Sequence, residues 1–353
     1  MMKFHRYRNS CIRAQSTITF SIKTHFNELL ATSGIIVLQR RCNYESIPLE
    51  DVAPVLLQAA RTVTLAKFTH ASFQPHLQSQ LKSIIQRFVD DEISDARAII
   101  ELLSLCEAIP SLEVQQEATA SASMPTEGEQ AVIMAISRLI PCLYECHMKE
   151  LSEAHLTTSY IHPFIHGLLS AKKPAKVAHC SNIVPDEYDN LTDRPDYKID
   201  VYAASGYRFS YTNAFGEVKK SINISPTLIV KEFYRLCIFC KEALDTHNLQ
   251  NVLAFQAVAN TVTFVAMCLP YPHLYTMTEL IRVKIPTRKQ AFFDIIGHLD
   301  NLLFVALIYR DHCVPSANDL SSRQCPTLSS VYIDDVEKKL APRKRPCNLT
   351  IDC

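Results

Sequence analysis

Glycine is scarce in this sequence, and neither sign of charge is in excess. The 353 residues include six glycines and eighteen prolines, which excludes a collagen-like or Gly-rich low-complexity chain. The 36 basic residues balance 36 acidic ones, so the chain as a whole offers no field that would steer a nucleic acid toward it. A nucleic-acid-binding function would therefore need a local basic patch.

Several common catalytic motifs are also missing. The sequence contains no GxGxxG, no P-loop and no GxSxG, so the usual nucleotide-binding and hydrolase sites have no support. Thirteen cysteines are scattered without a convincing secretory signal before them, which favours reduced thiols in an intracellular protein. The CxxC at Cys237–Cys240 has no second CxxC to complete a zinc site, and its helical surroundings favour core packing.

The composition is that of a globular protein. Hydrophobic residues make up 48% of the chain and charged residues 20%, and the length is sufficient for one large domain or two. The segment from Asn248 to Thr278 has no Asp, Glu, Lys or Arg, but polar residues interrupt it and Val, Thr and Phe dominate. We predict two buried strands with a turn near Asn260, and no contact with a membrane.

The apolar periodicity divides the chain into regions. The first 27 residues carry five basic residues and no acid, which predicts a disordered basic leader or, alternatively, a mitochondrial presequence. A basic cluster at Arg343–Arg345 is either a nuclear import signal or a solvated tail, so the predicted location is nuclear or cytoplasmic, with mitochondria left open. The predicted regions are a leader at 1–27, a helical region at 28–111, a linker at 112–130, the main domain at 131–314 and a disordered tail at 315–353.

Within the main domain the predicted order of elements is helix, strands, helix, strands, helix. The second helix is expected from about Pro226 to Thr246, and the strands after it at 252–258 and 261–268. This order predicts an α/β or α+β fold, in which a small mixed sheet lies between helices.

The stretch RPDYKIDVYAASGYRFSYTNAFGEVK, from Arg194 to Lys219, carries the candidate site. On a strand, Glu217 and Lys219 point to the same side. If two strands pair around Ser205-Gly206, then Asp196 lies almost opposite Glu217, because the midpoint of the two numbers falls in that turn. Two carboxylates so close repel each other unless a cation lies between them. The alternative interpretation is an ordinary strand pair with solvated surface charges.

Two details of these strands remain open. Asp200 shares the strand parity of Asp196 and is a reserve ligand. Tyr211 and Phe215 share the parity of Glu217, which is unusual for a polar face. Either a bulge near Asn213 to Gly216 resets the register, or the aromatic rings line a cleft and stack on bases. The bulge is the simpler interpretation.

Pro195-Asp196, followed about twenty residues later by Glu217-x-Lys219, resembles the PD-(D/E)XK nuclease superfamily. The flanking segments look like a group of fungal proteins with the same nuclease-like core, and the resemblance covers roughly Ser152 to Val314. It implies a restriction-endonuclease-like fold, with a mixed sheet of about four strands between helices. It also implies Mg²⁺- or Mn²⁺-dependent phosphodiester hydrolysis, with Asp196 and Glu217 as metal ligands and Lys219 assisting the water.

Further site residues are expected around this motif. In the superfamily an acidic residue on the helix before the first strand often completes the site, and Glu153 matches that place, with Glu150 in reserve. The Val218 backbone carbonyl is a further candidate oxygen ligand. The predicted substrate contacts are Lys172, Lys173, Lys220 and Gln256.

The partner implied is nucleic acid, DNA rather than RNA. The alternative is a catalytically inactive nuclease-like fold that acts as a nucleic-acid- or protein-binding scaffold.

Overall fold

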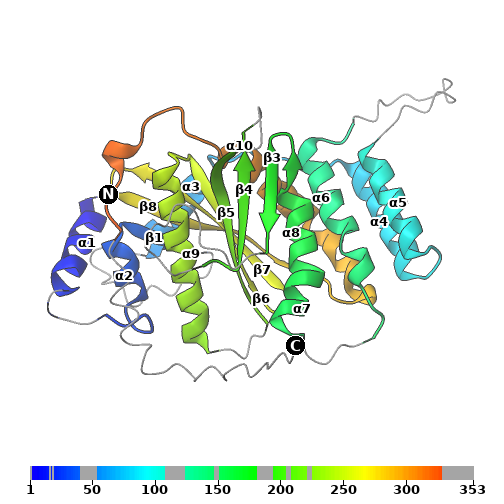
Figure 1. Ribbon diagram of the computed structural model, residues 1–353, viewed down its shortest axis with the longest axis horizontal. Helices are drawn as coiled ribbons and strands as arrows, with labels where there is room; N and C mark the ends of the chain where they lie inside the picture. The colour runs from blue at the N-terminus through cyan, green and yellow to red at the C-terminus, as the bar shows by residue number, and fades with distance from the viewer. Residues whose placement is uncertain are drawn as a thin grey trace, which may run out of the picture.

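The computed structural model describes residues 2–15, 17, 20–39, 54–107, 124–146, 151–180, 194–203, 208–220 and 225–327 (Figure 1). Its centre is an eight-stranded mixed sheet with helices packed against it. The predicted mixed α/β class is confirmed. The sheet is larger than the core of about four strands that the resemblance implied, because β1 from the N-terminal region extends it at one edge and the β2–β3 hairpin extends it at the other.

The strands lie in the order β1-β8-β7-β6-β5-β4-β3-β2. Neighbours from β2 to β5 pair antiparallel, β5 and β6 pair parallel, β6 to β8 pair antiparallel, and β1 joins β8 in parallel. Of the two parallel pairs, β5 and β6 follow each other in the chain and therefore need a crossover connection between them. The bounds are β1 (Ile35–Leu38), β2 (Ala171–Lys172), β3 (Ala175–His179), β4 (Tyr197–Tyr202), β5 (Phe209–Lys219), β6 (Asn251–Val258), β7 (Thr261–Tyr271) and β8 (Leu274–Lys284).

Two core clusters fill the two faces of this sheet. One joins the sheet to α4, α5, α6, α8 and α10, and the other joins it to α1, α2 and α9. In Figure 1, α1 and α2 lie near the β1 edge and α4 and α5 near the opposite edge. The helix bounds are α1 (Met2–Gln15), α2 (Phe26–Thr32), α3 (Pro54–Leu65), α4 (Pro75–Val89), α5 (Asp95–Cys106), α6 (Glu127–Ser137), α7 (Glu153–Leu156), α8 (His162–Leu169), α9 (Pro226–Thr246) and α10 (Leu299–His312). A π-helical turn (Thr157–Ile161) joins α7 to α8, and 3₁₀ turns cover Ile140–Cys142, Lys289–His298 and Ser321–Arg323.

Helix α9 is the crossover between β5 and β6, and its bounds match the prediction. Pro226 stands in its first turn, where a missing N–H costs nothing. The thiols of Cys237 and Cys240 are fully buried against the sheet, so the core-packing interpretation of the CxxC is confirmed. This packing fixes which face of α9 lies over the end of β5.

Two segments predicted to be disordered are ordered where the structure describes them. Residues 2–15 form α1, whose Phe4, Tyr7 and Cys11 are buried in the α9-side core. Their spacing of three and four residues was the helical signal inside the basic leader. Residues 315–327 also pack, because Cys325 is buried and its carbonyl accepts a hydrogen bond from Lys241 Nζ at 2.7 Å. The rest of the tail, 328–353, lies outside the described residues.

The helix after the predicted linker begins a few residues earlier than expected. Helix α6 begins at Glu127, where Thr126 and Glu129 form a capping box. Residues 108–123 lie outside the described residues. The N-terminal region contributes strand β1 as well as helices, since Ile35–Leu38 pairs with β8.

The register of β4 and β5 contains the predicted bulge. Ile199 pairs with Ala214 and Asp200 pairs with Thr212, so Asn213 is an extra residue on β5. Tyr197 pairs with Gly216, and one further step places Asp196 beside Glu217, as the midpoint of their numbers predicted. The Ser205-Gly206 turn itself lies outside the described residues.

The uncharged segment from Asn248 to Thr278 forms β6, β7 and the start of β8, with the predicted turn at residues 259–260. Among the described residues, the helical run Lys289–His312 is long and apolar enough to cross a membrane. Buried core helices have the same composition, and this run packs in the larger core cluster.

Gly216, directly before Glu217, lies under the ring of Phe255. A Cβ at this position would approach Phe255 Cζ to 2.2 Å. We therefore expect Gly216→Ala to lower the free energy of unfolding by about 1–3 kcal/mol through overpacking, measured by urea denaturation. Gly297→Ala is the matched control, because a Cβ there meets nothing within 4 Å. Equal midpoints for the two variants would contradict this packing.

Candidate functional site

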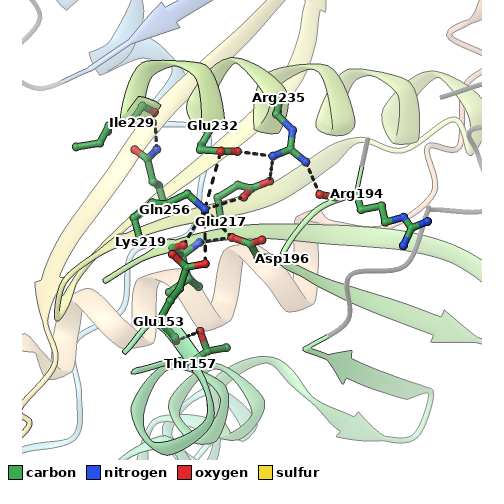
Figure 2. Close-up of polar contacts among 11 residues, drawn as sticks. Glu153, Thr157, Arg194, Asp196, Glu217, Lys219, Ile229, Glu232, Arg235 and Gln256 are labelled. Atoms are coloured by element: carbon green, nitrogen blue, oxygen red, sulfur yellow. Dashed lines mark hydrogen bonds and ion pairs between the residues drawn. The ribbon is translucent and has the colours of Figure 1, made fainter. Parts of the chain in front are cut away.

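Six charged side chains converge where β4 begins and β5 ends, beneath α9 (Figure 2). They come from four separate elements of the chain. Four are carboxylates and two are cations. The set comprises Glu153 of α7, Asp196 before β4, Glu217 and Lys219 of β5, and Glu232 and Arg235 of α9.

Local geometry explains why these side chains meet. Glu217 and Lys219 are two residues apart on β5, so both point to the face that α9 covers. Glu232 and Arg235 are three residues apart, so they share one side of α9. Glu153 stands in the first turn of α7, which Ser152 caps by accepting a hydrogen bond from the His155 backbone N–H at 3.1 Å.

Lys219 lies at the centre of the cluster. Its Nζ donates to Asp196 Oδ2 at 3.2 Å and to the Val218 carbonyl at 3.0 Å. The same Nζ lies 3.9 Å from one carboxylate oxygen each of Glu153, Glu217 and Glu232. Burial by itself lowers the pKa of Lys219, but the four carboxylates outweigh it and raise that pKa. The ammonium is therefore held in its charged form.

Asp196 is held in its ionised form. Its Oδ2 also accepts a hydrogen bond from the Val218 backbone N–H at 2.9 Å. Burial by itself raises the pKa of Asp196, but interactions with the Glu217 carboxyl, the Val218 N–H and Lys219 outweigh it and lower that pKa. Its side chain is still 27% exposed, so a ligand reaches it from solvent.

Glu217 is in the opposite situation. Its side chain is 0% exposed, and its oxygens lie 3.9 Å from Lys219 Nζ and 3.5 Å from Arg235 Nη1, but in the described part of the chain no N–H donor forms a hydrogen bond with either oxygen. Burial raises the pKa of Glu217 well above the ordinary value; Arg235 opposes this shift, and the charges of Asp196 and Glu232 add to it. A buried carboxylate without donors is costly and calls for an explanation, such as a ligand that the site receives.

Glu232 and Arg235 were not predicted from the sequence. Arg235 contacts the Glu232 carboxylate and the Arg194 backbone carbonyl, and its Nη1 lies 3.5 Å from Glu217 Oε1. The guanidinium also packs 5.6 Å from the Phe239 ring centroid. A signal was present, because Glu232, Leu236 and Phe239 fall on one helical stripe that is otherwise apolar.

Glu153 and Lys220 lie at the open side of the cluster. Burial raises the pKa of Glu153, and the charges of Lys219 and Lys220 oppose that shift. The Glu153 side chain is 46% exposed, and Lys220 is exposed next to Lys219. Glu153 thus lies on the helix before the first strands of the main domain, as expected, and Lys220 is accessible to solvent beside the cluster.

Three other predicted residues do not join the cluster. Gln256 pairs with Glu217 across β5 and β6, but its Nε2 donates to the Ile229 carbonyl at 2.8 Å and so ties α9 to the sheet. Lys172 and Lys173 lie at the β2–β3 hairpin, near the far end of β4. Six strand residues separate that end from Asp196, a distance of about 20 Å.

Asp200, the reserve ligand, belongs to a separate network. It pairs with Lys198 Nζ at 2.9 Å and accepts a hydrogen bond from Thr212 at 2.7 Å. Asp200 follows Asp196 by four positions along the strand direction, which places it about 13 Å from the cluster. The Val218 carbonyl, the other candidate ligand, is engaged by Lys219.

The carboxylate oxygens of the cluster are suitable ligands for a hard divalent cation. Carboxylate oxygens are the ligands that Mg²⁺ prefers, and the Glu217 oxygens lack donors. In the described residues, no three His, Cys, Asp or Glu side chains form a ready-made metal-binding group. The four carboxylates surround the Lys219 ammonium, and its Nζ lies within 4 Å of an oxygen of each.

Comparison with known proteins found no match among protein-family models, curated proteins or solved structures. The relationship to PD-(D/E)XK nucleases stays a prediction, which rests on these residues and their arrangement.

Proposed function

We propose that this protein hydrolyses phosphodiester bonds of nucleic acid with the help of a divalent cation. The observation that carries the proposal is the fully buried Glu217 carboxylate, which lacks a hydrogen-bond donor and lies beside Asp196 and Lys219. An ordinary solvated strand face would not bury such a group. The mixed sheet between helices, which the resemblance implies, supports the same function.

Asp196, Glu217 and Glu153 would hold Mg²⁺ or Mn²⁺. When bound, the cation supplies Lewis-acid activation of water and neutralises charge on the phosphate. Asp196 is ionised at neutral pH because its pKa is lowered, and the Val218 N–H fixes its orientation. Lys219 carries a permanent positive charge with which it stabilises the charge that develops on the phosphate oxygens.

A non-catalytic scaffold is the second candidate. It is favoured by the position of Lys172 and Lys173, which lie far from the cluster and leave Lys220 as the exposed lysine beside it. Among the described residues, the predicted basic side chains therefore do not form one substrate-binding patch around the carboxylates.

Cleavage of labelled DNA and RNA, each single- and double-stranded, tests the proposal. We expect cleavage by the purified protein with Mg²⁺ or Mn²⁺, most readily of DNA, and none with chelator. Asp196→Asn should reduce the rate by about 10²–10³-fold, the usual effect of removing one charge-stabilising group. Asp200→Asn is the control, since it changes a carboxylate of β4, the strand that follows Asp196, outside the cluster, and its rate should stay within a few-fold of the wild-type rate.

Folded protein that cleaves none of these substrates with either cation would favour the scaffold. Equal losses in Asp196→Asn and Asp200→Asn would show that the activity does not arise at this cluster.

A further inference from the structure

Two carboxylates of the cluster share the same pair of cations. Glu217 directs Oε2 toward Lys219 Nζ and Oε1 toward Arg235 Nη1. Glu232 directs Oε1 toward Lys219 Nζ and Oε2 toward Arg235 Nη1. Lys219 thus lies inside the ring of carboxylates and Arg235 outside it, as Figure 2 shows.

The Glu232 carboxylate lies as close to Lys219, at the centre of this ring, as the carboxylates of the predicted residues Glu153 and Glu217 do. Its Oε1 lies 3.9 Å from Lys219 Nζ, the distance found for Glu153 and Glu217. Its side chain is 8% exposed, so it is no solvated surface charge. A surface i,i+3 pair with Arg235 would not bury its carboxylate or turn one oxygen inward.

The charges of the cluster leave room for a divalent cation. The four carboxylates carry four negative charges when ionised, and Lys219 and Arg235 carry two positive ones, which leaves a net charge of −2. One divalent cation balances that charge. The buried Glu217 carboxylate without a hydrogen-bond donor points to the same kind of ligand.

We propose that Glu232 is a fourth carboxylate ligand of the cation site and that Arg235 is the positioning residue for Glu217 and Glu232. This inference rests on the proposed cation-dependent function. Carboxylates that hold a metal are themselves oriented by outer hydrogen-bond partners. The planar guanidinium reaches two carboxylates and the Arg194 carbonyl at once, which a lysine ammonium at this position would not do with the same geometry.

Mn²⁺ binding to the full-length protein, measured by electron paramagnetic resonance of free Mn²⁺, tests the role of Glu232. We expect Glu232→Gln to weaken binding at least tenfold. Glu242→Gln is the matched control, because it removes the same charge from α9 about 15 Å away. It should change the affinity less than about twofold, as expected for a charge beyond a Debye length at physiological salt. Glu232→Asp, which retains a carboxylate, should bind more tightly than Glu232→Gln and covers the case in which the amide variant fails to fold.

Arg235→Lys tests the positioning role, because it keeps the charge and removes the planar fork. We expect about tenfold weaker Mn²⁺ binding, with a clearly smaller loss when Glu232→Gln is already present, because only the positioning of Glu217 is then affected. A purely structural arginine would give additive losses in the double variant.

The outcomes separate this inference from the proposed function. If the wild-type protein binds Mn²⁺ and Glu232→Gln and Glu232→Asp bind it equally well, Glu232 is not a ligand, while the function stands. If the wild-type protein shows no saturable Mn²⁺ binding, the cation-dependent function fails and this inference fails with it.

Discussion

Glu217→Gln should lower cation-dependent cleavage by about 10²–10³-fold and at the same time stabilise the cation-free protein. Glutamine has the shape of protonated glutamate, so its amide supplies a donor toward Asp196 and an acceptor toward Arg235. The carboxylate at this position has no hydrogen-bond partner among the described residues. Relieving it should raise the free energy of unfolding in chelator by about 1–3 kcal/mol, the cost of an unsatisfied buried polar group.

The stability gain should depend on pH with a defined sign. The pKa of Glu217 is raised in the folded protein, first by burial, so the folded state keeps a proton that the unfolded state loses above its ordinary value of 4.5. The wild-type protein in chelator therefore loses stability as pH rises from 4.5 through the raised pKa. Glu217→Gln lacks this loss. Asp196 acts in a separate range, because its lowered pKa costs stability only as pH falls below about 3.8.

Urea denaturation of both proteins in chelator between pH 4 and pH 8 measures this difference. The gap between the variant and the wild type should widen as pH rises. Saturating Mn²⁺ should then reverse the order, because the cation stabilises the wild type by about 2.7 kcal/mol at a hundred times its dissociation constant. A variant that is less stable than the wild type in chelator at every pH would show that the Glu217 carboxylate is well accommodated without a cation.

Lys219→Met should separate cation binding from catalysis. The substitution removes an ammonium that lies within 4 Å of four carboxylates. In chelator the free energy of unfolding should fall by about 3–5 kcal/mol, because partners of a buried ion pair lose their counter-charge. Mn²⁺ should restore much of that loss and bind at least as tightly as to the wild type, since a competing positive charge is gone. Cleavage should nevertheless fall by about 10²–10⁴-fold, because the cluster loses the ammonium to which we assign stabilisation of the phosphate charge, while Arg235 stays engaged by Glu217 and Glu232.

Thermal unfolding with chelator and with Mn²⁺, beside Mn²⁺ binding and cleavage rates, measures these three effects. Lys220→Met is the control, because that neighbouring lysine is exposed. It should leave the stability unchanged within about 0.5 kcal/mol. If Mn²⁺ fails to rescue Lys219→Met, then the carboxylates around this position do not form a cation site.

Local periodicity and residue numbering were sufficient to predict much of this site. The alternation of side chains along β5 places Glu217 and Lys219 on one face of the sheet. Because β4 and β5 pair antiparallel, the residue numbers give the position of Asp196 opposite Glu217. The aromatic residues with the wrong parity predicted the bulge, and the structure has it at Asn213. These features depend on neighbours along one strand or one hairpin, so the sequence specifies them directly.

Other features depend on where distant elements meet. Lys172 and Lys173 look like neighbours of the site in the sequence, yet the antiparallel direction of β3 carries them to the opposite end of β4. The basic leader is ordered because Phe4 and Tyr7 pack into a hydrophobic core. Most residues of that core come more than two hundred positions later in the sequence.

The sequence by itself determined the strand and helix periods, the bounds of α9 and the pairing of Asp196 with Glu217. Only the tertiary structure decided that Glu232 and Arg235 belong to the cluster. The reason is that the angle at which α9 crosses the sheet sets which of its residues lie over the end of β5, and that angle follows from side-chain packing across the whole face. The same packing buries Glu217 completely and gathers four carboxylates around Lys219.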